Sequence, residues 1–113
     1  LVSLSGAVKS HITTLTDAAS VAVDFNDANI FLVTLGGNRT LAAPSNATGG
    51  QVGSIYVVQD GTGSRTLSYN TAWKFPAGSV PVATTTAAAV DLVLYSARSA
   101  TTIDAVMLKD FKR

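Results

Sequence analysis

Short apolar or alternating stretches, separated by turn residues, recur along most of this chain. In residues 20–25, Val21, Val23 and Phe25 alternate with small or polar residues, which predicts a strand that turns these three side chains into a core. Residues 30–35 are apolar on both faces, which predicts a strand that is covered on both sides. Further strands are expected at residues 39–43, 51–59, 65–69, 90–95 and 101–108.

Turn residues punctuate these strands at short and regular intervals. Asn, Asp and Gly gather at residues 26–29, 36–38 and 60–64, where they favour tight turns. Such spacing is typical of antiparallel all-β architectures, so we expect an antiparallel, jelly-roll-like β-sandwich of about seven or eight short strands. Residues 38–41 (Asn-Arg-Thr-Leu) and 64–67 (Ser-Arg-Thr-Leu) each follow a glycine-rich turn, which suggests two similar hairpins.

The first residues of the chain differ from the rest. Apolar residues from Leu1 to Leu15 are spaced by three or four, as on one face of a helix, but the Ser and Thr residues among them favour an extended conformation. We therefore expect residues 1–17 to form an N-terminal arm or edge strand, and residues 18–113 to form the β-sandwich domain.

Composition narrows the classes of protein that fit. A length of 113 residues indicates one domain. The net charge of +1 and the lack of a basic run argue against nucleic-acid binding, and no apolar stretch approaches the ~20 residues of a membrane helix. The chain has no Cys, so it has neither disulfides nor thiolate metal sites. Only 13% of the residues are charged, against about 25% in an average domain.

Candidate catalytic residues are few. His11 is the only histidine that could act as a base, and no serine stands in a nucleophile motif. All seven acidic residues are Asp, and none forms part of a calcium-loop pattern. We therefore expect no enzymatic activity, metal or cofactor.

Asp91 and Asp104 interrupt apolar strands and are candidate functional residues. One interpretation is that they point outward, or that one of them pairs with Arg65, Arg98 or Lys74. The other is a polar contact at a subunit interface, where a buried carboxylate needs a partner.

Tyr69, Trp73 and Phe75 lie close together at the end of one strand and in the following loop. Exposed aromatic residues on a loop could bind a saccharide. The alternative is that Trp73 and Phe75 pack into the end of the sandwich.

An ordered set of motifs occupies the second half of the chain. Gln-Asp-Gly-Thr-Gly-Ser-Arg-Thr at residues 59–66 is followed by Trp-Lys-Phe-Pro-Ala-Gly at 73–78, Thr-Thr-Thr-Ala at 84–87 and Ala-Val-Asp-Leu at 89–92. This set resembles a module of tailed-bacteriophage virion proteins, which occurs in tail fibres, head fibres, spikes and decoration proteins. The resemblance extends over residues 21–108.

The resemblance implies a structural protein of the virion, a fibre, spike or appendage module that assembles as a homo-oligomer, with a trimer expected, and that contacts other virion proteins. Strands that are apolar on both faces, as at Phe31, Val33, Tyr56 and Val58, need a second covering layer, which copies of the chain would supply. Two alternatives remain: a capsid decoration protein that binds capsomers through its N-terminal arm, and a module that binds a host-surface saccharide.

Overall fold

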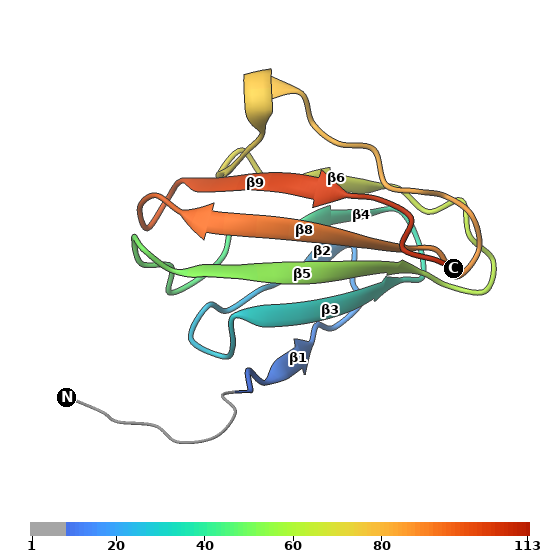
Figure 1. Ribbon diagram of the computed structural model, residues 1–113, viewed down its shortest axis with the longest axis horizontal. Coiled ribbons are helices and arrows are strands. Elements are labelled where there is room, and N and C mark those ends of the chain that lie inside the picture. Colours follow the sequence, from blue (N-terminus) through green and yellow to red (C-terminus); the bar gives the residue numbers. More distant parts are fainter. Residues whose placement is uncertain (1–8) are drawn as a thin grey trace.

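The computed structural model describes residues 9–113, which form two β-sheets around one core (Figure 1). The larger sheet has six strands, in the order β1 (Ile12–Thr14), β3 (Ile30–Leu35), β5 (Val52–Gln59), β8 (Val90–Ala97), β9 (Ile103–Leu108) and β7 (Trp73–Lys74). The smaller sheet has three strands, in the order β2 (Ser20–Val21), β4 (Arg39–Leu41) and β6 (Leu67–Tyr69). A short 3₁₀ turn, η1 (Pro76–Gly78), follows β7. The expected all-β class is therefore confirmed.

The expected antiparallel, jelly-roll-like sandwich is wrong, because five of the seven strand pairings in the described part of the chain are parallel. Only β8 runs against its neighbours, β5 and β9. Along the chain, β1 to β6 alternate between the two sheets, and each of β1 to β4 pairs in parallel with the strand two places later. The chain thus winds around the core from one sheet to the other and back. Each passage through both sheets is called a coil, and the three successive coils are β1–β2, β3–β4 and β5–β6. The β8–β9 hairpin comes later in the chain.

The glycine-rich turns connect sheets rather than neighbouring strands. Residues 36–38 lead from β3 in the larger sheet to β4 in the smaller one, and residues 60–66 lead from β5 to β6 in the same way. The two similar sequences at 38–41 and 64–67 therefore belong to equivalent corners of adjacent coils, and the expectation of hairpins is wrong. Alternation of side chains does not reveal this difference, because a strand has the same period of two in parallel and antiparallel pairs.

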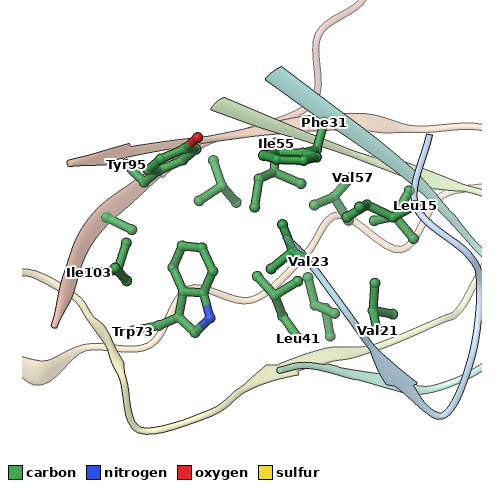
Figure 2. Packing of buried hydrophobic residues seen from close by; sticks show 14 of the residues in the cluster. Leu15, Val21, Val23, Phe31, Leu41, Ile55, Val57, Trp73, Tyr95 and Ile103 are labelled. Carbon is green, nitrogen blue, oxygen red and sulfur yellow. The ribbon is translucent and has the colours of Figure 1, made fainter. Parts of the chain in front are cut away.

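The core lies between the two sheets (Figure 2). Val21, Val23 and Phe25 are all buried, as the alternating pattern predicts. Phe25 packs against Phe31 and Tyr95, with ring centroids 6.1 and 4.7 Å apart, respectively. The segment before β3, β3 itself and β8 thus contribute rings to one aromatic cluster in the core.

The part of the N-terminal segment that the structure describes joins the larger sheet. β1 pairs in parallel with β3, and the amide of Leu15 donates a hydrogen bond to the Leu32 carbonyl over 2.8 Å. The Leu15 side chain is buried in the core. Within the segment 1–17 that was expected to be an arm or edge strand, Ile12–Thr14 thus form an edge strand, while residues 1–8 lie outside the described residues.

Ion pairs link the corners where the chain leaves the larger sheet. Asp17, which follows β1, accepts two hydrogen bonds from Arg39 at the start of β4, of 2.7 and 3.0 Å. Asp60 accepts hydrogen bonds from Arg65 across the next corner. The arginine partners hold the pKa of both carboxyl groups below the ordinary value. Asp104 has a lowered pKa for the same reason, through Arg98.

These pairs predict that the protein loses stability in acid. Because the folded carboxyl groups have lower pKa values than the unfolded ones, the unfolded state binds more protons as the pH falls. The melting temperature should thus stay level from neutral pH down to the unfolded value, about pH 4, and fall below it. Circular dichroism melts across this range test the prediction, with Asp60→Asn expected to reduce the drop. A melting temperature unchanged down to pH 2 would contradict it.

Candidate interaction surface

The larger sheet is apolar on the side that faces away from the core, which we call its outer face. Alternate positions of its strands turn to this side, because their neighbours in sequence are buried. The apolar side chains on the outer face are Ile12, Ile30, Leu32, Val52, Tyr56, Val58, Val90, Leu92, Leu94, Val106 and Leu108. Their gathering on one surface explains why residues 30–35 and 90–95 are apolar at nearly every position.

Strand register arranges these residues in rows across the sheet. Ile12, Ile30, Ser54, Leu94 and Val106 lie side by side on β1, β3, β5, β8 and β9, and we call them the Leu94 row. The adjacent row on the same strands consists of Thr14, Leu32, Tyr56, Leu92 and Leu108. Both rows are uncharged over their whole length, and every position except Ser54 and Thr14 is apolar or aromatic, so the outer face is a largely apolar surface rather than a set of scattered residues.

Charge on the outer face is confined to one margin. Among the described strands of the larger sheet, only Lys74 on β7 and Asp104 on β9 are charged residues at outward positions, and they pair in register. The guanidinium of Arg98 donates two hydrogen bonds to the Asp104 carboxylate. Asp104 thus has one of the arginine partners that the sequence suggested, and it lies beside the apolar surface rather than within it.

The smaller sheet presents the opposite chemistry on its own outer side. Ser20, Thr40 and Ser68 form its outward row, and the hydroxyl oxygens of Thr40 and Ser68 lie 2.7 Å apart. Hydroxyl groups such as these are readily hydrated, whereas a large contiguous apolar patch on a protein surface marks an interaction site. The outward rows of the two sheets therefore differ. Hydroxyl groups form the row of the smaller sheet, with Val80 and Val82 exposed beside β6, whereas apolar side chains dominate the rows of the larger sheet.

A groove of about 480 Å³ lies on the outer face at the β7 margin. Leu94, Val106 and Pro76 supply its apolar lining, and Lys74 and Asp104 supply charged groups. Pro76 belongs to η1, which projects beyond the edge of the sheet next to β9 (Figure 1). The groove is thus continuous with the Leu94 row.

The aromatic residues that could have formed a saccharide surface lie in the interior. Trp73 and Phe75 are buried, and the indole N–H of Trp73 donates a hydrogen bond to the Ala42 carbonyl over 3.0 Å. Tyr69 packs edge-on against Phe75, with ring centroids 4.7 Å apart. Stacking on a sugar needs an exposed ring face, so these positions favour the packing alternative over saccharide binding.

The hydroxyl group of Tyr69 is buried without a hydrogen-bond partner in the described part of the chain. Burial and, secondarily, the negative charge of Asp91 raise its pKa, so the group stays neutral. An unpaired buried hydroxyl costs about 1–3 kcal/mol.

Tyr69→Phe is therefore expected to stabilise the protein by about 1 kcal/mol in urea unfolding. The matched variant Tyr95→Phe should have the opposite effect, because the Tyr95 hydroxyl donates a hydrogen bond to the Asn29 carbonyl over 2.8 Å. Equal destabilisation by both substitutions would show that the Tyr69 hydroxyl has a partner after all.

Asp91 points into the molecule. The sequence suggested instead an outward position, an ion pair with Arg65, Arg98 or Lys74, or a polar contact at a subunit interface. Its carboxylate accepts hydrogen bonds from the amide and hydroxyl of Thr84, of 2.7 and 2.8 Å, and from the amide of Asp110, of 2.8 Å. Gln59, which is also buried, donates to the Thr84 carbonyl over 2.9 Å. Asp91 and Gln59 thereby fix the long segment between η1 and β8, as well as the C-terminal tail.

The residues of the motif at 59–66 form hydrogen bonds within the fold. The Gln59 side chain hydrogen-bonds both the amide and the carbonyl of Arg65, and Asp60 accepts hydrogen bonds from the amides of Thr62 and Gly63. Gly63 has a positive φ of 75°, and a Cβ there would lie 2.7 Å from the Thr85 carbonyl oxygen. These residues build a corner that holds the segment before β8. The role of the motif in this fold is therefore structural.

Candidate catalytic and metal-binding groups remain dispersed. His11 is exposed before β1, and no group of three His, Cys, Asp or Glu residues within residues 9–113 could hold a metal ion. In the same part of the chain, no helix has the length and apolarity to span a membrane.

No family model matches this chain, and no curated protein or solved structure is found to be similar to it. The outer face of the larger sheet is therefore identified from its own chemistry. The sequence signal for it is the apolar character of both sets of alternate residues in β3 and β8.

Proposed function

We propose that this chain is a non-enzymatic structural module of a bacteriophage virion, located in a fibre, spike or other appendage, and that it works as a homotrimer. The outer face of the larger sheet is the surface through which its copies assemble. The observation that carries the proposal is that this sheet is apolar on both sides, although the described chain covers only one of them. A sheet of this kind is the middle layer of a larger structure.

Three features support copies of the same chain as the covering layer. The two central rows of the outer face are uncharged, so like charges do not oppose one another when identical surfaces meet. The outward row of the smaller sheet carries hydroxyl groups that water can hydrate. The motifs that resemble virion modules form the corner and the segment before β8, so the resemblance concerns the framework that carries this sheet.

Labelling of purified particles tests the proposed function. An antibody raised against the chain is applied to particles of the phage that encodes it, with particles that lack the gene as the control. We expect label at a fixed position on the tail or another appendage. Label spread over the head surface would favour capsid decoration instead, and absence of the chain from the particles would contradict a virion role.

A further inference from the structure

The larger sheet has two margins of different shape, one at each end of its strand order. β1 forms one margin and carries Ile12, whose side chain is 49% exposed. β7 forms the other margin, next to β9, and contains the groove lined by Leu94, Val106 and Pro76. β1 and β9 lie toward opposite sides of the sheet in Figure 1. One margin thus presents an apolar side chain, and the other presents an apolar depression.

We propose that Ile12 on the β1 margin of one copy docks into the groove on the β7 margin of the next copy. This inference rests on the proposed homotrimer and specifies how its copies meet. The contact joins two different surfaces, so it is heterologous, and repeating it by rotation closes a ring.

Strand direction supports this arrangement. β1, β3, β5, β7 and β9 all run the same way, and only β8 is reversed. When three such sheets surround an axis parallel to their strands, with the outer faces turned inward, each β1 margin meets a β7 margin. Two β1 margins do not meet, because rotation about that axis preserves the order of the strands.

Strand register places the two partners at the same height. Ile12 and Val106 both belong to the Leu94 row, which runs across the sheet from β1 to β9. A rotation about an axis parallel to the strands keeps every residue at its level, so the row of one copy continues into the row of the next. Ile12 therefore arrives beside Val106 and Leu94, which line the groove.

The size of the outer face indicates that the margins take part in the contact. Strand spacing and rise give it dimensions of about 24 by 20 Å, or roughly 500 Å². A stable interface buries about 800 Å² on each partner. The remaining area has to come from residues beyond this face, such as Pro76 of η1 at the β7 margin.

Cross-linking between introduced cysteines tests the contact, because the chain has no cysteine of its own. The variant with Ile12→Cys and Val106→Cys is purified as the full chain, oxidised, and examined on a non-reducing gel. Within one copy the two positions are four strand spacings, or ~19 Å, apart, which is beyond the ~7 Å reach of a disulfide. Only a contact between copies can join them, and both positions are exposed, so the fold should tolerate the substitutions.

We expect the band to shift from one chain to three chains. The control with Ile12→Cys and Val82→Cys should give no covalent trimer, because Val82 lies beside β6 of the smaller sheet. Covalent dimers of the single variant Ile12→Cys would overturn the proposal, since they require two β1 margins to meet. An oligomer in light scattering that does not cross-link would also overturn it while leaving the proposed function intact. A monomer would overturn both.

Discussion

Leu94→Asp is expected to convert the assembled protein into folded monomers. Leu94 lies at the centre of the outer face, on β8, where the proposed assembly removes it from water. An unpaired charge buried at such a position costs about 3 kcal/mol or more, which weakens association roughly 100-fold. Light scattering of the purified variant at micromolar concentration measures the loss.

The fold of the single chain should survive this substitution, because the Leu94 side chain is 39% exposed before assembly. Circular dichroism checks this point. Ser68→Asp is the matched control, since it introduces the same charge on the outer side of the smaller sheet and should leave the assembly unchanged. Equal effects of the two substitutions would mean that the outer face of the larger sheet has no special role.

Gly53→Ala is expected to destabilise the chain itself. Gly53 lies on β5 opposite Tyr95, and a Cβ there would overlap the carbonyl oxygen of Asn29 and lie 2.5 Å from the Tyr95 hydroxyl oxygen. That carbonyl accepts the Tyr95 hydroxyl and the Ser54 amide, so moving it disturbs two hydrogen bonds. The free energy of unfolding in urea should fall by about 3 kcal/mol.

Gly61→Ala is the matched control for this prediction. An added Cβ at Gly61 meets no atom within 4 Å, and the residue lies in an exposed turn. Its effect should stay within about 0.5 kcal/mol. A similar loss from both substitutions would point to a general cost of replacing glycine and would contradict the specific packing of Tyr95 over Gly53.

Alternation of side chains predicted which residues of some strands would be buried. Val21, Val23 and Phe25 alternate with polar or small residues, and burial follows that pattern. Residues 90–95 are ambiguous, because both alternate sets contain apolar side chains. Neither set is the obvious inner one, so nothing local indicated that Asp91 would face inward and Leu92 and Leu94 outward.

Strand partners could not be predicted from local sequence. A glycine-rich turn between two strands fits a hairpin, but residues 36–38 lead the chain across the core to the other sheet. The repeated Arg-Thr-Leu at residues 39–41 and 65–67 was the available signal, since similar corners recur in a winding of successive coils. Three residues are too few to distinguish equivalent corners of a winding from two similar hairpins.

The chemistry of the outer sides of the two sheets accounts for the low charge of the chain. Serine and threonine supply polarity on the smaller sheet, and apolar residues without charges occupy the larger one. A charged residue in the Leu94 row would oppose the proposed packing of copies, because that packing removes the row from water. The 13% of charged residues is thus consistent with a surface selected for self-association.

The most direct test of self-assembly is the mass of the unmodified chain in solution, measured by light scattering after size-exclusion chromatography at micromolar concentration. The proposed assembly predicts three times the 11.6 kDa of one chain. A stable species with the mass of a single chain, its outer face open to water, would contradict it.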